Sequence, residues 1–510
     1  MMHHTAYIKI AWHAAARVSL RTVICLVVTI NFTNAGETPA VRDSYFGIHV
    51  VDEATGRGVP LVELRTVNDL RYVTDNAGWI AFQEPGLMNR EVFWHVSGPG
   101  VEREKDGFGF ACFRAVTKPG TSAEVKVKST NISVRLGRLT GQGIYRDSEI
   151  LGLPHPLPGI AEPGVMGQDS VQAVPWKGGF FWLWGDTNVA RYQLGNYHTT
   201  CATTAGDSHP EMGLAFAYFT DERNPETLRR MMPETEPGAV WMFGLMSVKD
   251  GQGGERMFSG YSRQKGLVPP DEKGIAEFDE ARGIFRPAAP LSKDEKWRTP
   301  GGHAVKVKSA EGEHFYFCTP YAYTRVKADA ASILDPGAYE MRHFNEACGQ
   351  WKWQKELQPT TAEDEKKAIA FGKMKQDQAR YHFTEAATGS PITLHGASIQ
   401  WNAWRKRFVL IGVQIAEKDA PSSLGEVWYA ESDAVEGPWC KSVKVASHPR
   451  YSYYNPVHHG FFDREDGRII YFEGTYTMEF SGNPIGTQRY DYNQLMYRLD
   501  LDDPRLQPAH

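Results

Sequence analysis

The chain has 510 residues, 41% of them apolar, which is too long for one ordinary domain and sufficient for two or three buried cores. Its formal net charge of -5 provides no broad positive field, so nucleic acid and anionic membrane surfaces are excluded as expected partners. The 14 Trp, 22 Tyr, 49 Gly and 30 Pro are typical of a chain rich in strands and turns.

The N-terminus has the pattern of a secretory signal peptide. Basic residues such as Lys9 and Arg21 precede an apolar run over residues 23–30, and a small residue, Ala35, stands at the expected cleavage point. The apolar run is shorter than the ~20 residues that a membrane helix needs. We therefore expect residues 1–35 to be removed and the mature protein to be soluble and secreted or periplasmic.

Five cysteines follow this segment, and they are widely scattered. An odd number without a CxxC pair or a Cys/His cluster is neither a disulfide framework nor a zinc site. If the chain carries a disulfide, the pairing that we expect is Cys318 with Cys348.

Residues 41–137 consist of short alternating runs, among them FGIHVVD, WIAFQ, REVFWHVSG and ISVRL. Seven such runs separated by turns predict a small antiparallel β-sandwich of the immunoglobulin or transthyretin type. The order VVDEATGRGVPLVELRT followed by YVTDNAGWIAF resembles the transthyretin-like, or carboxypeptidase-regulatory-like, domains that accompany secreted peptidases and carbohydrate-active enzymes. This resemblance implies an accessory domain.

The remaining residues, 138–510, contain a repeated hairpin. In each copy, a first strand-like run is followed, after a turn, by a second: QDSVQAV by FFWLWGDT, HAVKVK by HFYFCTP, ASIQW by FVLIGVQ, and HGFFD by IIYFEGTY. A weaker copy pairs MFGLMSV with RMFSGYS. Five hairpins, each followed by further strand-like segments, predict a five-bladed β-propeller, because isolated blades cannot bury both faces of their sheets. The fold class is therefore all-β.

Two further features refine this prediction. The last blade is the shortest, so we expect a strand from residues 139–150 to complete it. A charged stretch that begins TTAEDEKK predicts one helical insertion at about residues 355–383, with Thr and Asp near its start as capping residues.

Propeller geometry predicts where the polar residues meet. Innermost strands run along the central axis, so their first residues line one end of a funnel, and the second strand of each hairpin returns to the same end. The strand starts supply Asp169, His303, His395, Ser398, His458 and His459, and the returning strands supply Asp186 and Glu473.

Carboxylates that meet at one rim are what glycoside hydrolysis requires: one acid protonates the leaving oxygen, and a second carboxylate acts as base or nucleophile. Proximity of like charges raises one pKa and separates the two roles. The alternative interpretation of Gly-Asp-Thr after a strand is a turn whose Asp caps backbone amides.

The stretch GQDSVQAVPWKGGFFWLWGDT resembles the first blade of the five-bladed propeller glycosidase superfamily, the arabinanase and invertase type, and especially the endo-arabinanases. GEVWYAESDAVEGPW is similar to the outer blade strands of those enzymes. The resemblance implies that Asp169 and Asp186 are the acidic pair. Those glycosidases bring a general-acid Glu from a middle blade, whereas this chain has Gly-Gly-His303 there, so Glu473 is the substitute candidate.

We therefore expect a secreted glycoside hydrolase that acts on a polysaccharide or glycan, with Asp169, Asp186 and Glu473 as catalytic residues. The expected substrate-binding residues are Trp184, His303, His395, Ser398, Asn455, His458 and His459. No cofactor is required in this interpretation, and a carbohydrate is the only expected partner of a monomer.

Two other functions stay open. The funnel histidines, with or without a divalent cation bound together with Asp169, suit a polysaccharide lyase or a metal-assisted enzyme, for which Tyr453, Tyr454 and Arg489 are nearby in the sequence. A noncatalytic glycan-binding propeller is the third, because a fold does not imply catalysis.

Overall fold

The structure, a computed structural model, describes residues 41–157, 164–190, 199–233, 238–251, 253–264, 270–416 and 422–509. The predicted signal peptide lies outside these residues. Within them, no helix is long and apolar enough to cross a membrane.

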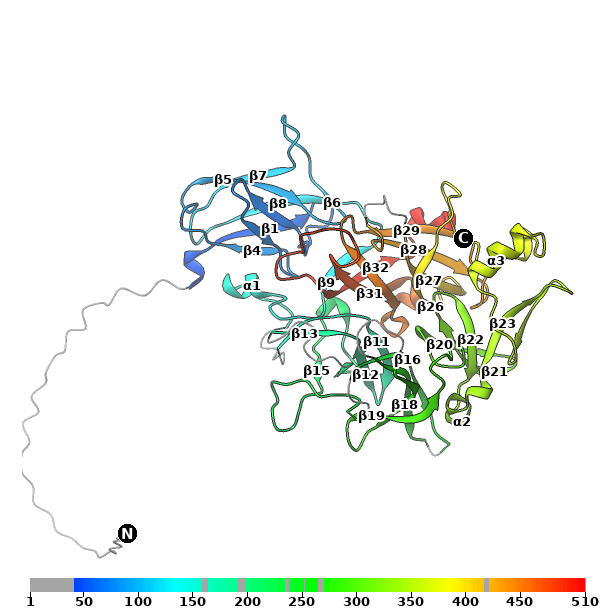
Figure 1. Ribbon diagram of the computed structural model, residues 1–510. Coiled ribbons are helices and arrows are strands. Elements are labelled where there is room, and N and C mark those ends of the chain that lie inside the picture. The colour runs from blue at the N-terminus through cyan, green and yellow to red at the C-terminus, as the bar shows by residue number, and fades with distance from the viewer. Residues whose placement is uncertain are drawn as a thin grey trace, which may run out of the picture. The chain divides into compact units, whose positions relative to one another are not determined.

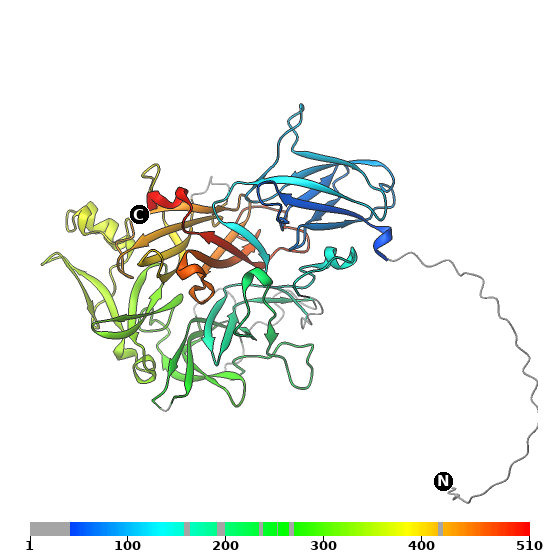
Figure 2. The same cartoon turned by 180° about the vertical axis from the view of Figure 1, so that it is seen from behind.

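The first part of the described chain is a sandwich of two four-stranded sheets. One sheet has the order β4 (Trp79–Phe82), β1 (Phe46–Asp52), β8 (Ser122–Ser129), β6 (Val101–Glu102), and the other β3 (Arg71–Val73), β2 (Glu63–Thr66), β5 (Glu91–Ser97), β7 (Cys112–Val116). Every second residue of β5 is buried, and Trp94 lies in the core with Ile48 and Leu64. The hairpin between β6 and β7 projects away from both sheets in the two views (Figures 1 and 2) and carries Phe108, which is exposed.

Five further sheets follow in chain order, and we number them as blades I to V. Blade I contains β11 (Gln172–Trp176), β12 (Gly179–Trp184), β14 (Thr200–Thr204) and β15 (Ala217–Tyr218). Blade II contains β16 (Ala239–Lys249), β17 (Glu255–Gln264), β18 (Glu272–Asp279) and β19 (Ile284–Leu291). Blade III contains β20 (His303–Ser309), β21 (Gly312–Cys318), β22 (Ala322–Lys327), β23 (Glu340–Asn345) and β24 (Gln350–Gln354).

Blade IV contains β26 (Leu394–Asn402), β27 (Arg407–Gln414), β28 (Glu426–Ser432), β29 (Lys441–Ser447) and the short β25 (Thr384–Glu385). Blade V contains β30 (Ser452–His458), β31 (Ile469–Thr477), β32 (Asn493–Asp500) and β9 (Val134–Arg138). A separate two-stranded ladder joins β10 (Val165–Gln168) to β13 (Thr187–Val189).

The innermost strands close into a ring. β11 contacts β16, β16 contacts β20, β20 contacts β26, and β26 contacts β30. One apolar cluster joins Val171 and Trp182 of blade I to Val457 and Tyr471 of blade V, so the last blade packs against the first. This arrangement is the predicted five-bladed propeller, and the all-β fold class is confirmed.

The strand that completes blade V differs from the predicted one. It is β9, the ISVRL run that the sequence analysis assigned to the sandwich, and it pairs antiparallel with β32. Residues 139–150 contain no strand and end in the short helix α1 (Arg146–Ile150). Since β9 follows β8 directly, its Arg135 side chain reaches back and donates hydrogen bonds to the carbonyl oxygens of Pro60 and Pro99 in the sandwich.

Other local predictions have mixed outcomes. The helical insertion contains α3 (Ala362–Ala370), with Thr361 and Asp364 forming a capping box, and a shorter helix, α2 (Ala330–Leu334), lies in blade III. The fifth hairpin begins earlier than predicted, at β30, because Gly460–Phe462 forms a 3-10 turn rather than a strand.

The predicted Cys318–Cys348 disulfide is wrong. Both cysteines are free: Cys318 ends the buried strand β21, whereas Cys348 lies in the exposed turn between β23 and β24. Sequence separation could not reveal that one side chain points into the core and the other into solvent.

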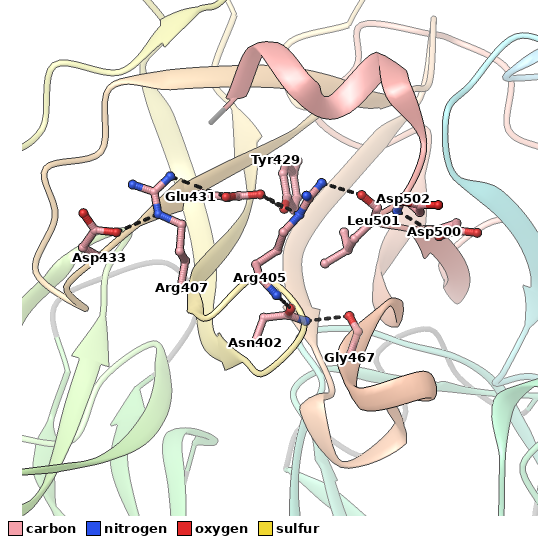
Figure 3. Close-up of polar contacts among 10 residues, drawn as sticks. All are labelled: Asn402, Arg405, Arg407, Tyr429, Glu431, Asp433, Gly467, Asp500, Leu501 and Asp502. Carbon is pink, nitrogen blue, oxygen red and sulfur yellow. Dashed lines mark hydrogen bonds and ion pairs between the residues drawn. The ribbon is translucent and has the colours of Figure 1, made fainter.

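A buried carboxylate ties blade IV to the C-terminal segment (Figure 3). Glu431 of β28 is in ion-pair contact with Arg405 at 3.1 Å and Arg407 at 3.6 Å, and its side chain is only 2% exposed. Arg405 also donates to the carbonyl oxygen of Leu501, and Asn402 donates to that of Gly467 at 2.7 Å. The β26–β27 turn is therefore held to blade V through one charged network.

Candidate active site

Asp169 and Asp186 face each other where the chain passes between the β10–β13 ladder and blade I. The amide of Asp169 donates to the carbonyl oxygen of Asp186 at 3.1 Å, and the amide of Gly185 donates to that of Asp169 at 2.9 Å. The Asp186 amide also donates to Oδ1 of Asp169 at 2.8 Å. The strand end that delivers Asp186 therefore returns to the start of the first strand, as the hairpin geometry predicts.

The carboxyl of Asp169 is held on both oxygens and is only 9% exposed. Its Oδ2 accepts a hydrogen bond from the hydroxyl of Tyr454 at 2.8 Å, and Tyr492 is a second hydrogen-bond partner. Burial first, and then the charge of Asp186, raise the pKa of Asp169 to about 7, although these hydrogen bonds act in the opposite direction. Asp169 thus changes its charge near neutral pH.

Asp186 has a different environment. Its side chain is partly exposed, and its Oδ1 accepts a hydrogen bond from the indole nitrogen of Trp241 at 2.9 Å. Burial raises the pKa of Asp186, and the Trp241 hydrogen bond opposes that shift. Of the two carboxyls, Asp186 is therefore the one that a bound molecule can reach.

A loop over residues 478–492, between β31 and β32, supplies a third carboxyl. Glu479 is exposed, and burial together with the charges of Asp491 and Asp186 raises its pKa. The next residue, Phe480, packs edge-on against Tyr454 with ring centroids 5.6 Å apart. Because Tyr454 holds Asp169, this contact places the start of the loop beside the acid pair.

The loop is fixed at its base by Asp491. Its carboxylate accepts hydrogen bonds from the hydroxyl of Thr477 and the amide of Met478, each at 3.0 Å. Phe480 is 63% exposed and large, so next to the acid pair it offers a flat apolar surface of the kind that stacks on sugar rings.

Unusual backbone conformations cluster around the pair. Ser170, Asn455, Phe480 and Tyr492 all have φ between 50° and 62°, in the left-handed region that costs free energy for residues other than glycine. Asn455 donates from Nδ2 to the Ser170 hydroxyl at 2.7 Å, which holds two of these residues together. Strain of this kind is characteristic of functional sites, where the surrounding structure fixes side chains in place.

Glu473 lies in the interior rather than at this rim. Its Oε1 is 2.6 Å from Nε2 of His459, and both side chains are 1% exposed. The hydroxyl of Thr475 accepts a hydrogen bond from the amide of Ser170, next to the acid pair. Glu473 precedes Thr475 by two residues on β31, a distance of roughly 7 Å along the strand. The predicted third acid is therefore buried in the propeller core, in hydrogen-bond contact with His459.

The predicted substrate-binding residues are spread over several environments. Asn455 joins the acid pair through Ser170, and His395 is exposed at the start of β26. Trp184 is fully buried against Trp182 and Phe216. Trp184 thus packs blade I and does not face a pocket.

The other histidines lie on or next to the inner strands, and His303 is a hydrogen-bond partner of the backbone of Asn455, the residue after Tyr454. His303, His458 and His459 line a cavity of about 420 Å³ on the inner strands. The Nε2 atom of His458 is 2.8 Å from Oδ1 of Asp463, and the His458 amide donates a hydrogen bond to the buried hydroxyl of Ser398. Burial lowers the pKa of His303 to about 4. Across the described residues, no group of three or more His, Cys, Asp or Glu side chains could hold a metal ion.

The side chains named for elimination chemistry do not gather either. Tyr453 is fully buried and donates to the carbonyl oxygen of Leu495, and Arg489 is paired with Asp147 at 2.9 Å. Only Tyr454 touches the acid pair.

Four residues at this candidate site, Trp241, Glu479, Phe480 and Tyr492, were not among those predicted from the sequence. Trp241 starts the weakest of the five hairpin copies, and its strand position was the available signal. The other three lie on a loop without periodicity, and nothing in their spacing shows that they lie beside Asp169.

Comparisons with known proteins find only distant similarities to solved structures. No family model and no curated protein matches the chain. Among solved structures, an exo-1,5-alpha-L-arabinanase from a bovine ruminal metagenomic library is 9% identical with a TM-score of 0.33, covering 66% of this chain and 94% of that one. The native arabinanase of Bacillus subtilis is 11% identical with a TM-score of 0.32, covering 66% and 96%.

An endo-1,5-alpha-L-arabinanase from Thermotoga petrophila RKU-1 is 12% identical with a TM-score of 0.33, covering 65% of this chain and 71% of that one. These identities and scores are too low to transfer an activity. The propeller described above stands on the sheet pairings of this chain.

Proposed function

We propose that this protein is a glycoside hydrolase in which Asp186 and Glu479 are the reacting carboxyls and Asp169 positions Asp186. The observation that carries the proposal is the meeting of a reachable carboxylate, Asp186, with a second carboxyl that is locked in place behind it and a third on the adjoining loop. Two carboxyls on either side of the glycosidic bond are the arrangement that most glycoside hydrolases use.

The roles follow from the surroundings. Glu479 has a raised pKa and is exposed, so its protonated form donates a proton to the leaving glycosidic oxygen. Asp186, held by Trp241, acts as the carboxylate that activates water or attacks the anomeric carbon. Asp169 holds the Asp186 backbone, because its Oδ1 accepts a hydrogen bond from the Asp186 amide.

The alternatives have less support. Elimination needs a base and a cation beside the substrate carboxylate, and Arg489 is already paired with Asp147. A noncatalytic glycan-binding protein would have no need for three carboxyls around strained backbone positions. Export after cleavage near Ala35, an accessory role for the sandwich and a monomeric state are part of the same proposal.

The test is a screen of the purified protein against plant, algal and bacterial polysaccharides that follows both new reducing ends and the ultraviolet absorbance of unsaturated uronates. We expect reducing ends without the ultraviolet signal, and their loss in Asp186→Asn but not in Asp377→Asn, an exposed aspartate on the helical insertion. Both signals together would establish elimination, and an active Asp186→Asn variant would refute the assignment.

A further inference from the structure

A second groove lies between blades III and IV. Its volume is about 740 Å³, and its walls come from the later parts of β20 and β26, from Trp353 and from the segment after β28. Gly396, near the start of β26, lies next to Asn455 at the acid pair, since a Cβ built on it would be 3.6 Å from Oδ1 of Asn455. Trp401 is five residues further along the strand, roughly 17 Å away, so this groove is separate from the acid pair.

The groove exposes a large aromatic surface. Trp401 is 51% exposed and is held edge-on by Phe408, with ring centroids 5.1 Å apart. A rigid indole that is half exposed in a concavity is costly to leave in water, and exposed apolar surface in a groove usually marks a binding site. A flat aromatic face of this kind matches the apolar face of a pyranose ring.

Arg342 also lines this groove and has no ion-pair partner among the described residues. The guanidinium of Arg342 packs 5.4 Å from the ring centroid of Trp353 and 5.9 Å from that of Trp351. Within the described parts of the chain, its Nε has no hydrogen-bond partner, and no carboxylate lies within ion-pair distance of the guanidinium. Glu436 is the acid whose charge acts most strongly on Arg342.

Neighbouring arginines are paired, which makes Arg342 distinct. Arg325 contacts Glu311 and Glu340, each at 2.7 Å, and Arg407 holds Asp433 at 2.7 Å (Figure 3). Lys306 and Lys308 add exposed ammonium groups on the β20 side, of which Lys306 is 4.0 Å from Glu313. Glu311, Asp433 and Glu436 line the groove as well. The groove thus combines one aromatic platform with two cationic side chains, Arg342 and Lys308, that have no ion-pair partner among the described residues.

We propose that the groove between blades III and IV binds an anionic glycan chain noncatalytically, with a pyranose ring on Trp401 and its carboxylate or sulfate near Arg342 and Lys308. That the occupant is a glycan rests on the proposed function, whereas binding here requires no hydrolysis. A bound chain would be retained on the enzyme while the separate acid pair acts on another part of it, which raises its effective concentration.

The experiment measures binding by calorimetry in an Asp186→Asn background, which prevents consumption of the ligand. The probes are polygalacturonate, a sulfated galactan and an uncharged xylan. We expect the acidic polymers to bind, Trp401→Ala to weaken binding by about tenfold or more, and Arg342→Gln to remove the preference for acidic over neutral polymers.

Trp404→Ala is the matched control, because Trp404 is 45% exposed on the same β26–β27 hairpin but does not line the groove. Thermal unfolding of each variant shows that it is folded. Binding of only polygalacturonate or only the sulfated polymer would identify the anionic group. Equal binding of xylan, no binding of either acidic polymer, or equal effects of Trp401→Ala and Trp404→Ala would overturn the proposal.

The outcome is separable from that for the proposed function. If the wild-type protein releases no reducing ends but Trp401→Ala still loses acidic polymer binding, only the hydrolase assignment fails. If hydrolysis occurs and the groove variants bind as the parent does, only the groove assignment fails.

Discussion

At the scale of single residues, identical carboxyl groups acquire different tasks from their surroundings. Asp169 is buried and bonded on both oxygens, Asp186 is reachable and bonded on one, and Glu473 is enclosed with His459. The strand pattern could predict that Asp169 and Asp186 meet, because a hairpin returns to its start. The strand pattern could not show that Glu473 is buried and Glu479 exposed, because the burial of each residue depends on how the blades pack in the ring.

The raised pKa of Asp169 has a consequence for stability. Its folded pKa, about 7, lies above the ordinary value of 3.8, so the folded state favours the protonated form. The contribution of protonated Asp169 to the stability of the folded state is therefore fully present below pH ~4, and it is lost as the pH rises through about 7. At pH 8 we expect the Asp169→Asn variant to have a higher unfolding temperature than the wild type. The gain in unfolding free energy should be at most about 4 kcal/mol at pH 8 and smaller at pH 5.

Thermal unfolding between pH 4 and pH 9 measures this difference. A gain for Asp169→Asn that does not grow with pH would contradict the burial argument.

Glu473 provides a second residue-scale test. Burial raises its pKa well above the usual range, and the pKa of His459 falls to about 3, mainly through burial, so a protonated Glu473 donates to a neutral imidazole. Gln can make the same donation. We expect Glu473→Gln to retain activity and Glu473→Ala to cost about 2–4 kcal/mol of unfolding free energy.

Denaturant unfolding and initial rates on the polysaccharide distinguish the two roles. A stable but inactive Glu473→Gln would restore Glu473 as a catalytic residue.

At the scale of elements, the charged network around Glu431 joins a turn, a strand and the C-terminal segment (Figure 3). Removal of one partner of a buried ion pair leaves the others uncompensated, so we expect Glu431→Ala to cost about 3–5 kcal/mol. Asp433 is the control, because it contacts the same Arg407 but its side chain is 83% exposed. Asp433→Ala should cost less than about 1 kcal/mol.

This prediction is tested by the denaturant midpoints of the two variants, provided that the unfolding free energy of both depends on denaturant concentration with the same slope. Similar losses for Glu431→Ala and Asp433→Ala would mean that the network adds nothing beyond a surface ion pair.

Most blade hairpins could be predicted from the alternation of apolar and polar residues along the sequence, because this alternation shows which side chains face a neighbouring sheet. Trp184 shows the limit. It ends a strand beside Asp186, and only the packing of Phe216, which directly precedes β15, and of Tyr218 in β15 decides that it is buried.

At the scale of the whole molecule, the propeller depends on a strand, β9, that precedes its partner strand β32 by more than three hundred residues. β9 pairs with β32, and its alternation is the same as that of a sandwich strand, so the sequence alone could not assign it. A chain that starts at residue 139 would expose the edge of β32. We expect it to aggregate or to unfold at a markedly lower temperature than a chain that starts at residue 41.

Size-exclusion chromatography and thermal unfolding of the two chains test this expectation. A monomeric shorter chain with an unchanged unfolding temperature would show that β9 is dispensable for ring closure.

The division of labour between Asp186 and Glu479 is tested most directly by the rates of Asp186→Asn and Glu479→Gln on a polysaccharide and on an aryl glycoside with a good leaving group. A good leaving group needs no proton, and general acid catalysis contributes about 10²–10⁴-fold. We expect Asp186→Asn to be inactive on both substrates, and Glu479→Gln to be slow on the polysaccharide and near wild type on the aryl glycoside. Wild-type rates for Asp186→Asn, or equal losses for Glu479→Gln on both substrates, would contradict this division of labour.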